Sequence, residues 1–141
     1  MADPGLVYAA VRLTLAADSS LVSEVSSADR IYQGWGPKKV TPANSPFIAI
    51  TETGEVDISC ERGVMGFTMF GFDVNVFGYN LDQVNRIRGR VKHVLTGTLI
   101  KPNTDWKNLL SWTLGGGPAF PPDDLGMHRR HVETRVIAQL A

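Results

Sequence analysis

The sequence predicts an α+β fold, in which a mostly antiparallel β-sheet carries two main α-helices packed on one face. Apolar residues recur at helical spacing in two stretches, 6–17 and 80–95. They alternate with polar residues in several other stretches, and the coarse order of elements is helix, short helix, three strands, helix and two strands. At 141 residues the chain fits a single domain spanning 1–141.

The first predicted helix spans residues 6–17 and is apolar on almost every side. Pro4 can begin it and Asp3 can cap it. Its less apolar side carries Ala9 and Ala16, which are small rather than charged. A helix of this kind suits partners on more than one side, and one of them could be another subunit. The alternative is that alanines on an exposed face are harmless.

Short elements follow the first helix. Asp18 and its two serine neighbours can cap a short second helix that contains Leu21 and Val25. The stretches after it predict a strand at 30–35, a proline-containing loop at 36–46, a strand at 47–51, a turn at 52–55 and a strand at 56–58.

The central strand is predicted at residues 66–79, which alternate with period two. Phe70, Phe72, Val74 and Val76 fall on the side expected to face the core. Met69, Asp73, Asn75 and Phe77 fall on the other side, which we expect to lie outside the core.

Residues 80–95 switch to helical periodicity, with Val84, Ile87 and Val91 on one stripe. Asn80 or Asp82 can cap this helix, and Gly97 can end it. Arg86, Arg90 and His93 share the face opposite the stripe, with Asp82 placed to pair with Arg86.

Two strands are predicted after this helix. The first lies near 108–114, where Leu110, Trp112 and Leu114 alternate with polar residues, so Trp112 is expected in the core. Residues 115–127 contain glycines and prolines and predict a flexible loop or arm that exposes Phe120. The closing strand at 131–139 alternates cleanly.

Composition excludes several classes of protein. The formal net charge is +0, so no global field recruits nucleic acid or an anionic membrane. Cys60 is the one cysteine, which rules out an internal disulfide framework and fits a reducing compartment. The amino terminus does not read as a secretion signal, and no apolar run approaches the roughly 20 residues that span a membrane.

The sequence predicts neither an enzyme nor a cofactor. Cys60 has no histidine near it in the sequence, which favours an unreactive thiol. Asp123, Asp124, His128 and His131 could suggest a metal site, but residues three apart on a strand face opposite sides. The glycines at 115–117 lack the ending of a phosphate-binding loop.

Several residues are candidates for an interface with another subunit or a partner. A basic helix face is usually only solvated, yet in an assembly it could meet a neighbour or DNA. Tryptophan is enriched at interfaces, and Trp35 stands beside a loop. The candidates are Trp35, Asp73, Asn75, Phe77, Arg86, Arg90, His93, Phe120, Arg129 and Arg130.

The layout resembles the tail terminator, or tail completion, proteins of tailed bacteriophages. The resemblance rests on the helix at 6–18, on residues 30–32 entering a proline-containing loop, and on the strand at 46–50. It continues through the strand at 72–77 into the helix with Val84, Ile87 and Val91. It covers residues 5–100 and, more loosely, the final strand, whereas 115–127 looks like an insertion.

This resemblance implies a structural virion protein that assembles in the host cytoplasm. It implies a hexameric ring at the head-proximal end of the tail tube, which stops tube polymerisation and offers a docking surface for the head or neck. Expected partners are further copies of the chain, the tail tube protein and a neck or connector protein. Genomic DNA would pass non-specifically through the lumen. No membrane partner is implied, and no catalytic residues are carried over.

Other functions stay open at this point. A head–tail connector or neck protein belongs to the same structural class and differs in docking on the portal side. A small ligand-binding α+β domain would need a pocket with convergent polar groups. A sequence-specific nucleic-acid binder is disfavoured by the balanced charge.

Overall fold

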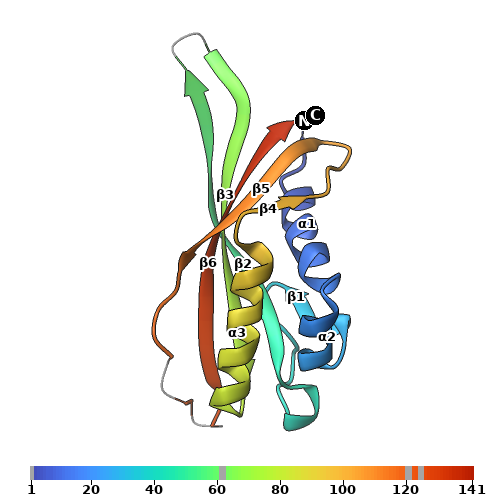
Figure 1. The fold of residues 1–141 in the computed structure, drawn as a ribbon, viewed down its shortest axis with the longest axis vertical. Helices are drawn as coiled ribbons and strands as arrows, with labels where there is room; N and C mark the ends of the chain where they lie inside the picture. Colours follow the sequence, from blue (N-terminus) through green and yellow to red (C-terminus); the bar gives the residue numbers. More distant parts are fainter. Residues whose placement is uncertain (1, 61–62, 120–121, 124–125) are drawn as a thin grey trace.

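The computed structural model describes residues 2–60, 63–119, 122–123 and 126–141, without the side chains of 58–60 and 63–65. A six-stranded mixed sheet, in the order β1-β2-β3-β6-β5-β4, carries the helices on one face (Figure 1). The predicted α+β class is therefore confirmed. The helices are α1 (Gly5–Ala16), α2 (Ser19–Val25) and α3 (Leu81–Leu95). The strands are β1 (Ile31–Gln33), β2 (Phe47–Cys60), β3 (Gly63–Gly78), β4 (Thr98–Ile100), β5 (Trp106–Gly115) and β6 (His128–Leu140).

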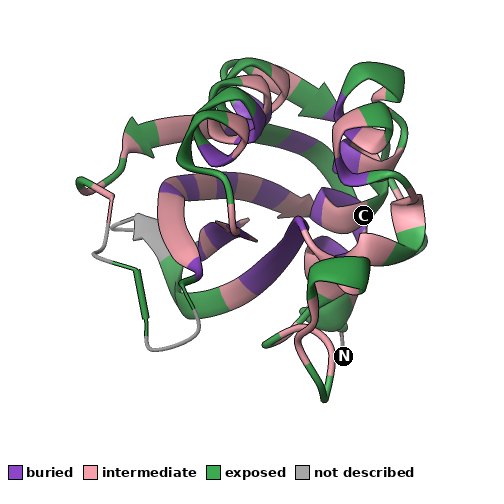
Figure 2. Cartoon of the chain, turned by 90° about the horizontal axis from the view of Figure 1, so that it is seen from below, coloured by how far each residue is buried: buried purple, intermediate pink, exposed green. Residues whose placement is uncertain are grey.

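All strand pairings are antiparallel except β1 with β2. The main core lies between the helices and one face of the sheet, here called the inner face (Figure 2). β3 contributes alternate residues to it, and α3 contributes its apolar stripe, as predicted. The fully buried members include Phe70, Phe72, Val74, Val76, Val84, Ile87 and Val91.

The closing strand behaves as predicted. In β6, Val132, Thr134, Val136 and Ala138 are fully buried, while the residues between them are half-buried. This alternation places one face of β6 against the core and leaves the other on the outer face of the sheet.

The predicted turn at 52–55 is wrong, because β2 runs through it as one continuous strand. Its pairing with β3 shifts register between Glu52 and Gly54, which leaves Thr53 as an extra residue. A bulge of this kind absorbs one residue and bends the strand without ending it. The glycine that suggested a turn adopts a φ of 154° within the strand.

The prediction that Trp112 lies in the core is also wrong. Asn108 has a positive φ of 50°, and the pairing of β5 with β6 shifts register between Lys107 and Leu110. One extra residue reverses which side chains face inward. Leu109 and Ser111 are therefore fully buried, whereas Trp112 is half-buried on the outer face.

Side chains cap α2 and α3 at predicted positions, whereas the N-cap residue of α1 is Pro4, which has no side-chain hydrogen bond, rather than the predicted cap Asp3. Asp18 Oδ2 accepts a hydrogen bond from Leu21 N at 2.9 Å, and Asn80 Oδ1 accepts one from Gln83 N at 3.2 Å. Gly97 follows α3 with a φ of 63° and turns the chain into β4, a three-residue strand that sequence periodicity missed.

A second, smaller cluster covers part of the outer face. Phe47, Ala49 and Met127 are buried there, and Val40 and Phe77 pack against them. Met127 belongs to the segment predicted as a flexible arm, so this end of that segment is packed on the sheet. Phe120 and Asp124 lie outside the described residues.

Within the described residues, no single helix is long and apolar enough to cross a membrane. Helices α1 and α2 reach the length and apolar composition of a membrane span only when they are taken together, and an 85° bend separates them.

Candidate interaction surfaces

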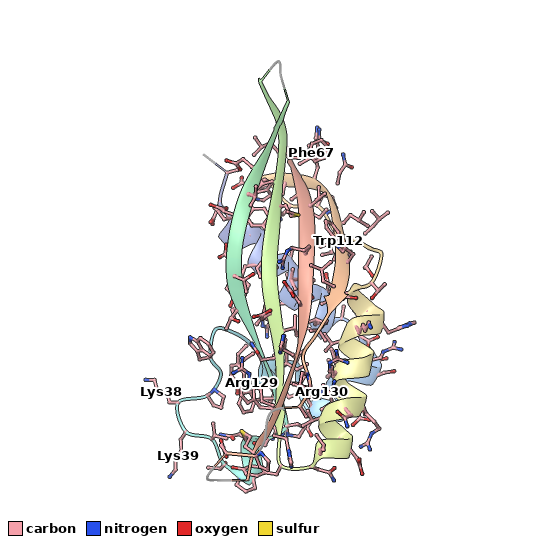
Figure 3. The ribbon with its side chains drawn as sticks, turned by 90° about the vertical axis from the view of Figure 1, so that its left-hand side faces the viewer. Lys38, Lys39, Phe67, Trp112, Arg129 and Arg130 are labelled. Carbon is pink, nitrogen blue, oxygen red and sulfur yellow. The ribbon has the colours of Figure 1, made fainter. Side chains whose placement is uncertain are left out.

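The outer face of the sheet changes in chemistry from one end to the other. Figure 3 looks onto this face, with Lys38, Lys39, Arg129 and Arg130 at its lower end. The cross-strand register sets out the rows of side chains. Phe77 stands beside Arg129, Asn75 beside His131, and Asp73 beside Glu133.

Asn75 is fully buried, so the expectation that its face lies outside the core is wrong at this position. Its Nδ2 donates to the carbonyl oxygen of Ala49 at 3.1 Å. Its Oδ1 accepts from Arg129 Nε and Nη2 at 3.2 and 3.0 Å. Arg129 also lies 5.8 Å from the centre of the Phe77 ring. These residues tie the start of β6 to the sheet.

Arg88 and Arg130 meet where α3 crosses β6. Arg88 Nε donates to the carbonyl oxygen of His131 at 3.1 Å. Arg130 donates to Asn85 Oδ1 at 3.0 Å and to the carbonyl oxygen of Gly117 at 3.3 Å. The pKa of Arg88 is lowered mainly by burial of its guanidinium and, to a smaller extent, by repulsion from Arg130. No acid is bonded to either guanidinium among the described residues.

The basic face of α3 is partly used inside the chain. Arg90 makes two hydrogen bonds to the carboxylate of Asp18, at 2.8 and 2.6 Å, which hold α2 against α3. Arg86 lies 3.5 Å from Glu24 on α2, whereas the predicted partner was Asp82. His93 is exposed. Only Arg86 and His93 of this predicted face point largely to solvent.

Trp35, which follows β1, is 75% exposed. A residue that is buried at a subunit interface can be this exposed in an isolated copy. Asp73 and Phe77 are half-buried. The interface roles predicted for these residues stay predictions.

An apolar row crosses the outer face nearer its upper end. Register places Val56 beside Met69, Met69 beside Ile137, Ile137 beside Leu110, and Leu110 beside Leu99. The two ends of this row are exposed, Val56 by 58% and Leu99 by 78%. Trp112 lies in the same half of this face (Figure 3). Sequence periodicity alone does not predict this row, because bulges in β2 and β5 determine which residues of neighbouring strands lie side by side.

A groove of about 580 Å³ separates α1 from the β4 edge. Most of its lining is apolar, and Leu13 on its α1 side is 61% exposed. Lys101 and Asn103 add polar groups at the β4 side. The sequence signal for this surface was the apolar, alanine-rich character of α1 all round.

The part of the chain that the structure describes holds no cluster of metal-ligating side chains. Within it, no three histidine, cysteine, aspartate or glutamate side chains gather as a metal site would require. Cys60 ends β2, and its side chain is outside that part.

Comparison with known proteins gives one kind of match. No protein family and no curated protein matches the chain in sequence. Among solved structures, the chain is similar to one from the virion of a native gene transfer agent particle. The two share 19% identity, the match covers 94% of each chain, and the TM-score is 0.72. The likeness at this identity is one of fold, and it extends over nearly the whole domain.

Proposed function

We propose that this chain is a structural virion protein, a tail terminator that caps the head-proximal end of a phage-like tail tube as a hexameric ring. The observation that carries the proposal is the fold shared with a virion chain over 94% of both chains. The resemblance of residues 5–100 to tail terminators, found independently in the sequence, agrees with it.

The surfaces of the chain suit an assembly subunit. They include an apolar row with exposed ends and an apolar groove beside an edge strand. Surfaces of this kind on a small protein mark sites of protein contact. A ring also has to present different chemistry above and below, because one side accepts the tube and the other must not. Glu55 and Asp57 are exposed on β2. The end of β2 that leads to β3 lies opposite the end of the molecule that carries Lys38 and Lys39 (Figures 1 and 3).

In this role the ring adds one layer whose far side no longer accepts tube protein, so polymerisation stops. That far side then docks the neck or connector, and DNA passes through the lumen without sequence-specific contacts. The function is mechanical and requires no reaction. A head–tail connector is the alternative, since its subunits face the same structural demands.

Assembly without the protein separates the two roles. A particle-producing strain that lacks this gene should make over-long tail tubes if the protein is a terminator. Tails of normal length beside unjoined heads would instead indicate a connector. Normal infectious or transducing particles would contradict both.

A further inference from the structure

The structure leaves strand edges without partners at both ends of the sheet. β1 pairs with β2 only at Ile48–Ile50. Among the described residues, positions 51–57 of β2 therefore have no strand on the side away from β3. Among the described strands, β4 pairs with β5 alone and lies at the opposite end of the sheet. Unpaired edges are templates for pairing with another chain.

These two edges match in direction and level. Four antiparallel pairings separate β2 from β4, so the two strands run in the same direction. Val56 and Leu99 are the two ends of one cross-strand row, so they stand at the same level along the strands. A neighbouring copy displaced across the sheet would bring its Val56 level with Leu99 without sliding along the strands.

The two edges also match in chemistry. Val56 is an exposed apolar side chain between two exposed acids, Glu55 and Asp57. Leu99 is exposed beside the apolar groove under α1, and Lys101 follows at the end of β4. In the assembly, Val56 of one copy, which lies between two acids, would thus meet an apolar surface of the next copy that ends in a lysine. The groove leaves room beside β4 for an added strand.

We propose that adjacent copies join edge to edge, with residues 51–57 of β2 in one copy pairing with β4 of the next and Val56 packing beside Leu99. The contact uses different surfaces on the two copies, so repetition forms a ring when the rotation closes. This inference rests on the proposed ring and names the surfaces that build it. Strand pairing supplies backbone hydrogen bonds, and the Val56–Leu99 contact fixes the register.

Disulfide trapping tests this arrangement. Neighbouring strands lie about 4.8 Å apart, within the roughly 4.4–6.8 Å that a disulfide spans between Cα atoms. In a Cys60→Ser background, the Val56→Cys and Leu99→Cys variants are mixed and oxidised, on tail tubes and in solution. The mixture should give a disulfide-linked dimer, while each variant alone should not. A chain with both substitutions should give a closed covalent ring.

A matched control uses Leu81→Cys, an exposed leucine at the start of α3, in place of Leu99→Cys. It should not cross-link with Val56→Cys. A second comparison places a charge in the row by Leu99→Asp and outside it by Leu114→Asp, at leucines that are 78% and 56% exposed. The first change should weaken ring formation at least tenfold, and the second should leave it nearly unchanged.

The outcomes distinguish the two proposals. Rings that form without the Val56–Leu99 cross-link, and that tolerate Leu99→Asp, would overturn the edge-to-edge contact and leave the terminator role standing. A chain that stays monomeric in solution and on tubes would overturn both. Cross-linked rings that fail to arrest tube growth would support the contact and contradict the terminator role.

Discussion

Asp18 joins two helices through one carboxylate. It caps α2 by accepting from Leu21 N, and it binds Arg90 on α3 with both oxygens. The hydrogen bond from Arg90 is the largest of the causes that lower the pKa of Asp18. Arg90 was predicted as an interface residue, yet its guanidinium is engaged within the chain. Charge reversal at Arg90 would therefore disturb the monomer itself.

The Asp18 pair should make stability depend on pH. Its carboxyl has a lower pKa folded than unfolded, so its contribution is present above the unfolded pKa of about 3.9 and is lost as pH falls through the folded value. Asp18→Asn keeps a capping side chain but removes the charge. Urea titrations should find wild type more stable than Asp18→Asn at pH 7, with the gap closing in acid. A gap that does not change with pH would contradict this. Asp18→Ala should lose about 1 kcal/mol more through the missing cap.

Gly116 tests how tightly the segment after β5 lies on β6. A Cβ at this position would come within 2.0 Å of the His131 carbonyl oxygen. Gly116→Ala should therefore destabilise the fold by about 1–3 kcal/mol, since backbone must move. Gly89 on α3 is the matched control, because a Cβ there meets nothing within 4 Å. Gly89→Ala should stabilise by roughly 0.5–1 kcal/mol. Equal effects in thermal denaturation would show that 116 is not held against β6.

At the scale of elements, the bulge in β5 determines which leucine is structural. Leu109 is fully buried and Leu110 is 39% exposed, the reverse of the plain alternation in the sequence. Leu109→Ala should cost about 2–5 kcal/mol, whereas Leu110→Ala should change the stability of the monomer by no more than about 0.5 kcal/mol. Chemical denaturation of the two variants measures this directly. A larger loss for Leu110→Ala would mean that β5 runs without the bulge.

The elements differ in how well the sequence predicts them. The stripe of α3 and the alternation of β6 were predictable because every residue in them repeats one period. The bulges at Thr53 and Asn108 were not predictable. One extra residue reverses which side chains of a strand face the core, while the composition of the strand stays the same. β4 is too short for any periodicity. Of the candidate surfaces, the apolar character of α1 was visible in sequence, but the row from Val56 to Leu99 needed the register of five strands.

At the scale of the molecule, the described chain is a sheet with helices on one face and with strand edges at both ends that lack a full partner. Val56 and Leu99 are exposed at those edges, and Leu13 is exposed in the groove beside β4. A monomer gains nothing from such surfaces, whereas a ring subunit uses the edges for its neighbours and the two ends for different layers. The suitability of these surfaces for a ring subunit, together with the fold shared with a virion chain, is the basis of the terminator proposal.

Electron microscopy of tail tubes polymerised with and without the purified protein tests the proposed terminator role most directly. A terminator should form a single ring on one end of each tube and give a narrow distribution of tube lengths, with a mean length that falls as more protein is added. Tubes of unchanged length, with no ring at either end, would contradict it.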